Sequence, residues 1–584
     1  MRHIASRSTA VVETRPYCLA LAMATCVAVA PSFAQQSPRD PVGLSDTLRE
    51  DQQRRQPPAQ DFKPAETTIK PAVKPVTGLM VDVRGFRFSG LTVMPQERLQ
   101  GVVQKFLGAG KTFDDLQAAA DAASEYLQQR GYFVAQVYLP EQPIADGIIE
   151  LAVLEGRLAQ VRVDMEGDVP VARHIVEGLL SPLAPGTVMH RDVVERALFL
   201  VSDLRALRVR SIVEPGPTPG TSILVVKVTP GRRIDGLIEF DNHSSRFTGD
   251  YRLGAGVNIN SPFRRGDLLS ARGLIGVPGG GADLDFGRIS YLTPVGIYGT
   301  KIGLAYLRLN YHLGTSLFDP VDQKGRAEVA SVFGLHPIVR TRNFNLFAQA
   351  SFDLREFEDD RRAVNIKSER KTKVGGLGLV GDTRDAYLGG GINNFSLGYT
   401  AGHLDIQTPA DLAADQSTLG GRTAGHYSRL NGSATRLNSL TQNIGLFVSY
   451  SFQLASKNLD ASEKVGLGGP TAVRAYGVGE ATSDEAQLFT AEIRGGLPKL
   501  DFIPGTIVAS GFFDFAQGKL NKDPQPLQAA TNTRTLRGLG VGLTWGRQDD
   551  FLVRVTAAWR LSGPAISDPV DRHPRLFFTL QKFL

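Results

Sequence analysis

The chain has 584 residues, and its 65 Lys and Arg against 59 Asp and Glu give a formal net charge of +6. So small a basic excess on so long a chain does not favour a nucleic-acid-binding protein. Hydrophobic residues make up 42% of the sequence and charged residues 21%, a balance that excludes both a chain disordered throughout and a coiled coil. The sequence is therefore long and apolar enough to build a sizeable folded core or wall.

The first 34 residues have the pattern of a secretory signal peptide. Three arginines precede an apolar run over residues 18–30, and a small-residue cleavage site ends at Ala34. The apolar run is shorter than the roughly 20 residues that a membrane-spanning helix needs. Both cysteines, Cys18 and Cys26, lie in this segment. The sequence therefore predicts an exported mature chain without thiols, which excludes metal-thiolate and cysteine-nucleophile chemistry.

Residues 35–78 are polar and rich in Pro and Gln, which is typical of a tether rather than of a packed core. Within 35–56, the helical spacing of Leu44 and Leu48 predicts one short polar helix that reaches Gln56, with Ser45 as its N-cap. Residues 57–78 are predicted to form a stiff, Pro-rich linker.

Residues 79–156 are predicted to form a module of mixed helices and strands. In chain order, the patterns indicate a strand over 81–88, helices over 95–107 and 113–129, and strands over 132–139 and 148–153. The same order recurs in residues 157–231, as a strand over 158–165, helices over 171–180 and 191–204, and strands over 209–214 and 221–228. Two α+β modules in series are therefore predicted.

Residues 232–584 alternate apolar and polar side chains at the period of β-strands, as in 251–260, 444–454 and 551–560. In water, the polar faces could be the outside of an antiparallel sandwich. In a membrane, they would face a wet lumen while the apolar faces contact lipid. The exported context, the segments of about ten residues and the small polar residues opposite the apolar ones favour the membrane alternative.

The length of this region predicts the number of strands. At about 22 residues for each strand with its connection, residues 232–584 accommodate about 16 antiparallel strands, an even number as in bacterial outer-membrane barrels. A closed barrel pairs every backbone group inside lipid. The apolar stretch 576–584 runs to the last residue, as a closing strand would. The predicted fold class is a transmembrane β-barrel preceded by the two α+β modules.

The sequence offers no candidate for catalysis. It contains no His-x-x-x-His pair, no Gly-x-Ser-x-Gly elbow and no complete phosphate-binding loop. The glycine triplets at 279–281 and 389–391 lie between alternating segments and are interpreted as hairpin turns or loops. No enzyme activity, metal or cofactor is expected.

The Gly-flanked segment 466–477 lacks alternation and contains Arg474 and Tyr476. It could simply be an exposed loop. Farther along, the alternation of residues 507–515 directs Asp514 into the lumen, which suggests a loop folded back into the barrel and held by a charge-assisted bond from Arg474. A water-filled lumen in which Asp514 is merely solvated fits the alternation equally well.

Several motifs resemble those of two-partner secretion transporters, the TpsB class of the outer-membrane assembly-factor superfamily. The first POTRA domain of that class is resembled by the first module at residues 131–132, 139–147 and 153–156. The second POTRA domain is resembled by the second module at 192–204 and 221–228. The first barrel strands are resembled at 241–249 and 266–267. The superfamily's lumen-loop motif, Val-Arg-Gly-Tyr/Phe, is matched by Val473, Arg474, Ala475 and Tyr476; its Phe-x-Asp strand motif is matched by Phe512, Phe513 and Asp514. Two departures are the Ala475 at the motif glycine and the terminal Leu584 in place of an aromatic residue.

The resemblance implies a 16-stranded barrel in the outer membrane of a Gram-negative bacterium. It further implies two periplasmic POTRA modules, an N-terminal helix that plugs the pore, a linker, and a contact from Arg474 to Asp514 that holds the lumen loop. The expected function is passage of a dedicated unfolded exoprotein, TpsA-like and similar to haemolysins or adhesins, to the cell surface by two-partner secretion. Other expected partners are outer-membrane lipid and, during biogenesis, the barrel-assembly machinery, with no nucleic acid.

Two alternatives remain at this stage. An insertase that helps other barrels to assemble would share the arginine motif, although two POTRA-like modules are fewer than a general insertase is expected to carry. A passive porin or ligand receptor is less compatible with modules that precede the barrel, and no plug domain of the size found in receptors is visible in the sequence.

Overall fold

The computed structural model describes residues 80–584 except 145, 278–282, 315–318, 526–530 and 567–571. The predicted signal peptide, the short helix ending at Gln56 and the linker at 57–78 lie outside these residues. None of the helices in the described ranges is long and apolar enough to cross a bilayer.

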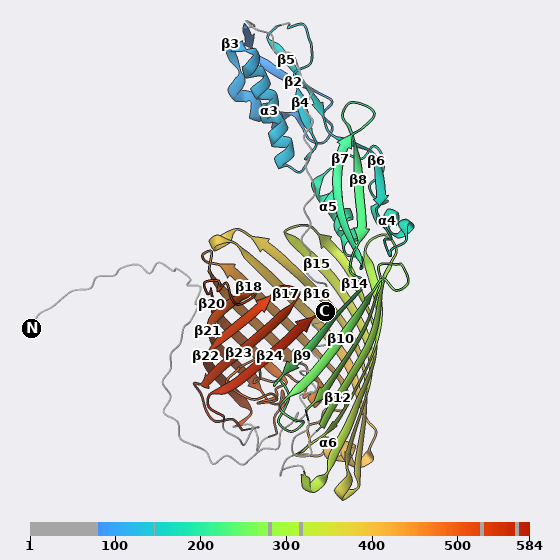
Figure 1. Ribbon diagram of the computed structural model, residues 1–584, viewed down its shortest axis with the longest axis vertical. Coiled ribbons are helices and arrows are strands. Elements are labelled where there is room, and N and C mark those ends of the chain that lie inside the picture. Colours follow the sequence, from blue (N-terminus) through green and yellow to red (C-terminus); the bar gives the residue numbers. More distant parts are fainter. Residues whose placement is uncertain (1–79, 145, 278–282, 315–318, 526–530, 567–571) are drawn as a thin grey trace, which may run out of the picture. The chain divides into compact units, whose positions relative to one another are not determined.

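The described part of the first module contains two α-helices and two small sheets, arranged as in Figure 1. Its elements are β1 (Met80–Val83), β2 (Gly85–Ser89), α2 (Gln96–Val103), the 3-10 turn η1 (Gln104–Phe106), β3 (Gly108–Thr112), α3 (Phe113–Gln129), β4 (Gln136–Tyr138) and β5 (Ile148–Leu154). Strand β5 is central, parallel to β2 and antiparallel to β4. Because Leu116, Ala120 and Leu127 recur at helical spacing on α3, they bury one face of that helix in the core.

Three details of the first module differ from the sequence prediction. The single strand expected over 81–88 is two strands, because the chain turns at Arg84, whose amide donates to the carbonyl oxygen of Gly147 at 2.7 Å. Strand β3 was not predicted, and the strand expected over 132–139 forms only at Gln136–Tyr138. A Gly-Lys-Thr tripeptide at 110–112 is no phosphate loop, since Thr112 is the N-cap of α3.

The second module repeats the plan of the first. Its elements are β6 (Arg157–Met165), α4 (Arg173–Leu180), α5 (Arg191–Ser202), β7 (Leu207–Pro215) and β8 (Thr221–Pro230). Strand β8 is central, parallel to β6 and antiparallel to β7. A contiguous apolar core lies between this sheet and the two helices, and Leu198, Val201 and Val226 are fully or almost fully buried in it.

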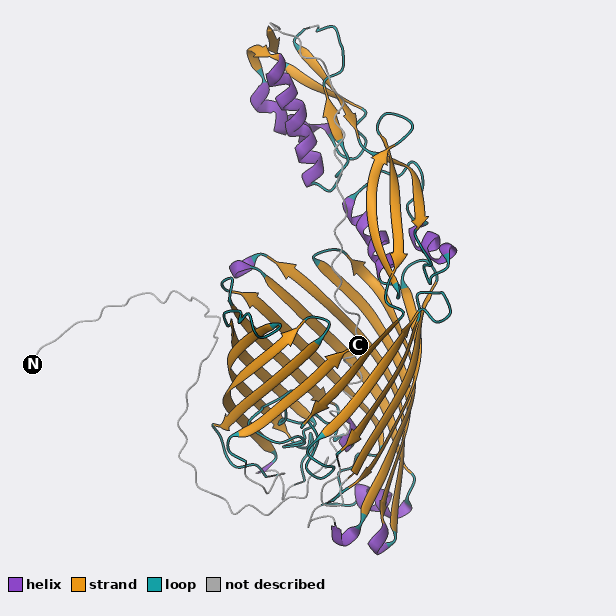
Figure 2. Cartoon of the chain, in the orientation of Figure 1, coloured by secondary structure: helices purple, strands orange, loops and turns teal. Residues whose placement is uncertain are grey.

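Residues from Ile234 onward form a closed barrel of 16 antiparallel strands, which confirms the predicted fold class (Figures 1 and 2). The strands are β9 (Ile234–Asp241), β10 (Arg252–Asn260), β11 (Leu268–Gly276), β12 (Asp283–Val295), β13 (Thr300–His312), β14 (Gln323–Arg340), β15 (Phe344–Arg361), β16 (Ile366–Asp385), β17 (Gly391–Ile406), β18 (Gly425–Ser439), β19 (Ile444–Ala455), β20 (Glu485–Gly496), β21 (Thr506–Lys519), β22 (Thr533–Arg547), β23 (Phe551–Arg560) and β24 (Arg575–Phe583). Short helices in the connections are η2 (Asp319–Val321), η3 (Arg362–Val364), η4 (Tyr387–Gly389), α6 (Pro409–Gln416) and η5 (Ala461–Glu463).

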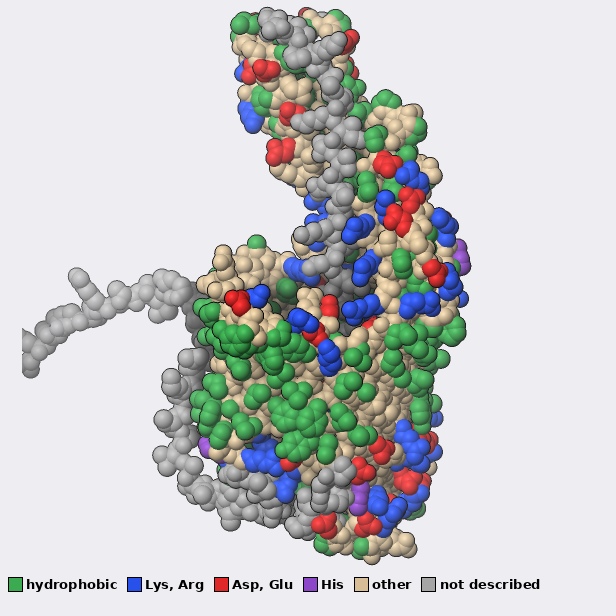
Figure 3. All heavy atoms as spheres, viewed as in Figure 1, with side chains coloured by type: hydrophobic (Ala, Val, Ile, Leu, Met, Phe, Trp, Pro, Cys, Tyr) green, Lys and Arg blue, Asp and Glu red, His purple; other side chains and the backbone are tan. Residues whose placement is uncertain are grey.

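The barrel wall presents apolar side chains outward and polar or small ones inward. Leu377 is 67% exposed on the outer face, whereas its neighbours Gly376 and Gly378, on the other face of β16, are glycines. On the face drawn in Figure 3, apolar side chains form a band across the barrel, with charged residues above and below it. Because lipid solvates such a band and water fills a polar lumen, this distribution is that of a membrane barrel and not of a sandwich.

The chain closes the barrel with its last strand. β24 pairs with β9 from Thr579 to Phe583, and the backbone amide and carbonyl of Leu584 each bond to Gly236. Leu584 therefore continues the strand pairing through its backbone. This pairing does not require an aromatic side chain at residue 584.

Candidate functional site

The connection between β19 and β20, residues 456–484, folds into the barrel, and it is called the lumen loop below. Its two ends pair with each other: the backbones of Val465 and Ser483 exchange hydrogen bonds of 2.9 and 2.8 Å, and the amide of Leu467 donates to the carbonyl oxygen of Glu480. Within the loop, residues 458–466 form its first limb and residues 470–478 its second limb. Nearly all of its residues from 459 to 484 are buried or half-buried. The loop is a packed part of the lumen rather than an exposed connection.

The structure brings Arg474 and Asp514 together. Both oxygens of the Asp514 carboxylate on β21 accept from the guanidinium, from Nε at 2.9 Å and from Nη2 at 2.9 Å, and the backbone amide of Arg474 donates at 3.1 Å. Thr490 on β20 donates a further bond to Asp514 at 3.0 Å. Asp514 is completely buried, so its charge is compensated by these donors and not by bulk water.

The guanidinium of Arg474 has two further contacts on the wall. Its Nη1 donates to Glu492 at 3.0 Å, and Glu492 also accepts from Arg494. The central carbon of the guanidinium, Cζ, lies 3.3 Å from the ring centroid of Phe512. A planar, delocalised cation suits both contacts, because it can stack on an aromatic face while it donates in its own plane. Phe512 and Asp514 of the strand motif thus contact the same side chain.

Tyr476 anchors the second limb of the loop at another place. Its ring is fully buried, and its hydroxyl lies 2.8 Å from the carbonyl oxygen of Ser562 and 2.9 Å from that of Gly563, after β23. Val473 is also buried, and its amide donates back to Leu467 within the loop. The motif therefore contributes one charged anchor, one hydroxyl anchor and one apolar contact.

Ala475 occupies the position of the motif glycine without an unusual backbone. The positive-φ residues of the described chain do not include it, so no glycine is needed there for conformation. Its methyl group instead faces Gly538 on β22, where an added Cβ would lie 2.7 Å from that of Ala475. The bulk at residue 475 is accommodated by the absence of a side chain at residue 538.

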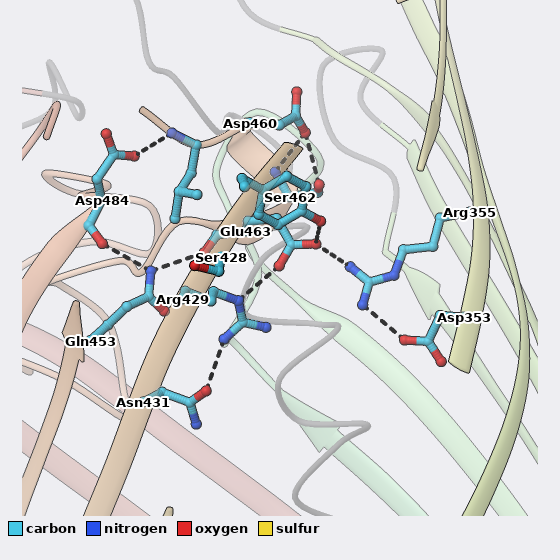
Figure 4. Close-up of polar contacts among 12 residues, drawn as sticks. Asp353, Arg355, Ser428, Arg429, Asn431, Gln453, Asp460, Ser462, Glu463 and Asp484 are labelled. Atoms are coloured by element: carbon cyan, nitrogen blue, oxygen red, sulfur yellow. Dashed lines mark hydrogen bonds and ion pairs between the residues drawn. The ribbon is translucent and has the colours of Figure 1, made fainter. Parts of the chain in front are cut away.

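A second group of buried charges holds the first limb of the loop (Figure 4). The Glu463 carboxylate accepts from Arg355 on β15 at 2.6 Å, and from Tyr427 and Arg429 on β18 at 2.8 Å each. Arg355 also donates to Asp353 at 2.8 Å. Sequence reasoning missed all of these residues.

Other contacts support this limb. Asp460 accepts from Arg370 on β16 at 2.6 Å, and Lys464 pairs with Asp484 at 2.6 Å. The amide of Gln453, at the end of β19, donates to the carbonyl oxygens of Glu463 and Asp484. The two ends of the loop are therefore joined to each other and to the wall. In the described ranges, no group of three or more His, Cys, Asp or Glu could hold a metal ion.

Comparisons with known proteins agree with this architecture. Residues 81–156 match the family model of the ShlB-type POTRA domain, and residues 220–544 match that of the haemolysin secretion/activation protein ShlB/FhaC/HecB. The heme/hemopexin transporter protein HuxB of Haemophilus influenzae strain 86-028NP is 26% identical over 483 residues, which cover 82% of each chain. The outer membrane transporter CdiB of Dickeya dadantii strain 3937 is 21% identical over 535 residues, 90% of each chain.

Two solved structures have a similar fold. CdiB from Escherichia coli superposes with a TM-score of 0.70 at 20% sequence identity, covering 95% of this chain and 100% of that one. CdiB from Acinetobacter baumannii gives a TM-score of 0.60 at 19% identity, covering 92% and 96%.

Proposed function

The chain belongs to the haemolysin secretion/activation family of outer-membrane, two-partner secretion transporters, and from that membership we propose that it carries one dedicated exoprotein, unfolded, to the cell surface. The observation that supports this most directly is a closed barrel whose lumen holds a loop anchored to the wall by Arg474. A lumen narrowed in this way suits an extended chain better than a folded domain. The cargo class that we propose is haemolysin-like or adhesin-like.

We assign capture of the cargo to the two α+β modules, of which the first matches the ShlB-type POTRA domain and the second is proposed to be a POTRA domain as well. The edge strands of their three-stranded sheets are β2 and β4 in the first module and β6 and β7 in the second, and the start of β6 already pairs with residues 186–188. An extended segment can add to such an edge through backbone hydrogen bonds, which require no particular sequence in the cargo. Capture by strand addition would deliver an unfolded chain to the periplasmic mouth of the barrel.

Translocation in this scheme uses no ATP, and folding of the cargo outside the cell supplies the direction. The role proposed for Arg474 and Asp514, with Val473, Ala475, Tyr476 and Phe512 around them, is to fix the loop that shapes the conduit. The short helix predicted at 44–56 would leave the pore before passage. The apolar band would contact outer-membrane lipid, and the barrel-assembly machinery would insert the barrel.

The proposal is tested with a candidate partner exoprotein, sought first among the neighbouring genes, by measuring its release from cells with and without this chain. We expect surface release to be lost in the deletion strain and restored by the intact chain, with other outer-membrane barrels at normal levels. If release were unchanged and other barrels were depleted, the chain would act as an insertase, and the secretion proposal would be wrong.

A further inference from the structure

We propose that Glu463 is a positioning residue that clamps the first limb of the lumen loop to the barrel wall, independently of the clamp that Arg474 forms on the second limb. The first limb is defined as residues 458–466 and the second as 470–478. The effect of Glu463 on secretion rests on the function proposed above, whereas its clamping of the limb does not.

The contacts of Glu463 reach across the wall. One carboxylate, from a loop residue that is 2% exposed, accepts three hydrogen bonds from two separate strands, β15 and β18. Two of the donors are guanidinium groups, and hydrogen bonds between charged groups are shorter and stronger than neutral ones. Figure 4 shows the side chains of Arg355 and Arg429 converging on Glu463 from different strands. A contact of this kind fixes the position of the limb and not only its depth in the lumen.

The charges in this cluster balance only when Glu463 is docked. Arg355 has Asp353 as a second carboxylate partner. Arg429 donates to Asn431, a neutral group, and among the residues that the structure describes Glu463 is the carboxylate that it contacts. Arg429 is 7% exposed. Withdrawal of Glu463 therefore leaves a buried guanidinium without compensation unless water enters with it.

The two clamps have opposite polarity and share no residue. In the second limb a loop cation, Arg474, binds wall anions on β20 and β21; in the first limb a loop anion, Glu463, binds wall cations on β15 and β18. Strand β19 lies between the two groups of strands in the barrel order. Release of one clamp thus leaves the hydrogen bonds of the other in place.

Charged contacts also suit a loop that has to move. Once the loop is released into a wet lumen, the carboxylate and both guanidiniums are hydrated again. The net free energy of docking is therefore modest compared with the electrostatic attraction between these groups. An apolar anchor would expose its surface to water on release and would oppose every opening. The polar wall therefore provides a fixed resting position that remains reversible.

Site-specific labelling tests the proposal in the full chain reconstituted in liposomes. Because the sequence holds only Cys18 and Cys26, both in the predicted signal peptide, a single cysteine can report on each limb: Ala461→Cys on the first and Ala472→Cys on the second. The rate of reaction with a polar maleimide is compared in three backgrounds, Glu463→Gln, Arg474→Gln and Glu356→Gln. Glu356→Gln is the matched control. Glu356 lies on β15, next to Arg355, but it is exposed and pairs with Lys371 on β16.

We expect Glu463→Gln to raise labelling at residue 461 by about tenfold or more, since it weakens three hydrogen bonds to charged or polar donors. Labelling at residue 472 should change less than about twofold, and Arg474→Gln should give the reverse pattern. An unchanged rate at residue 461, or equal increases at both positions, would overturn the independent clamp. Heat-modifiable migration on gels verifies that each barrel is folded.

Secretion is then measured with the same variants. Suppose that Glu463→Gln raises labelling at residue 461 alone and that exoprotein release does not change. This outcome would contradict the proposed role of the loop in shaping the conduit. It would leave the clamp itself established. The two measurements therefore separate failure of the clamp from failure of the proposed function.

Discussion

Replacement of Arg474 by alanine should release the second limb of the lumen loop and impair secretion. The side chain is 11% exposed and its partner Asp514 is 1% exposed, so solvent screens the pair very little. The variant loses three side-chain hydrogen bonds to two carboxylates and the stacking on Phe512. Asp514 keeps only the Thr490 hydroxyl and one backbone amide as donors.

The magnitude follows from the unpaired carboxylate. Removing one partner of a buried ion pair costs about 3–5 kcal/mol, because the remaining charge stays in a poorly hydrated place. That cost lowers the ratio of docked to released loop by at least about a hundredfold, at tenfold for each 1.4 kcal/mol. Arg474→Lys retains the charge but cannot bind Asp514 through a planar fork or stack on Phe512 in the same way, so its effect should be intermediate.

The assay is release of the partner exoprotein, normalised to the amount of heat-modifiable barrel in the outer membrane. Arg308→Ala is the matched control, because Arg308 is half-exposed and its pair with Glu328 at 3.7 Å should contribute little. We expect a normal amount of barrel in both variants and strongly reduced release in Arg474→Ala alone. Normal release by Arg474→Ala at normal barrel abundance would refute the role proposed for the loop.

Three further predictions concern other contacts of the molecule. Gly538→Ala places a methyl group 2.7 Å from that of Ala475, so we expect overpacking to destabilise the docked loop by about 1–3 kcal/mol and to reduce secretion. The double variant with Ala475→Gly should recover release. Tyr476→Phe removes one hydroxyl from the carbonyl oxygens of Ser562 and Gly563, at about 1 kcal/mol, and protease sensitivity of the loop should rise by less than in Arg474→Ala. Hydrogen bonds from the backbone and the hydroxyl of Thr112 lower the pKa of Asp115 below its usual 3.8. The cap should therefore stabilise α3 above about pH 4, and this stabilisation should be lost as the pH falls through the lowered pKa. Amide exchange of α3 should show this pH dependence in the unmodified chain and lack it in Asp115→Asn.

The sequence predicts the barrel well because its strands are specified by a local property. Side chains alternate between lipid and lumen along each strand, so the inward direction of Asp514 follows from its neighbours on β21 alone. The bounds of α3, predicted over 113–129, agree with the structure because Thr112 caps its beginning and Gly131 follows its end. Strands β1 and β3 pair with each other outside the main sheet, and the weak, Gly-rich pattern of β3 gave no sign of that pairing.

The partners of the lumen loop could not be predicted in the same way. Alternation along β15 marks Asp353 and Arg355 as inward-facing, but it is poor around Arg429, and it does not tell which segment of the chain fills the lumen next to these residues. Glu463 lies 108 residues from Arg355 and 34 from Arg429 along the chain. Only closure of the barrel places these strands around one loop. Resemblance directed attention to Arg474 and Asp514, and no comparable motif singled out Glu463.

The arrangement of the two clamps has a consequence for how a chain could pass the loop. Glu463 and Arg474 bind different strands of the wall, and the backbone pairing of Val465 with Ser483 joins the first limb to the end of the loop. A cargo segment that displaced Glu463 would meet the guanidiniums of Arg355 and Arg429, whereas one that displaced Arg474 would meet the carboxylates of Glu492 and Asp514. The lumen therefore offers either sign of charge to a passing segment, and it can exchange contacts with an extended polypeptide of mixed charge without a strong preference for one sequence.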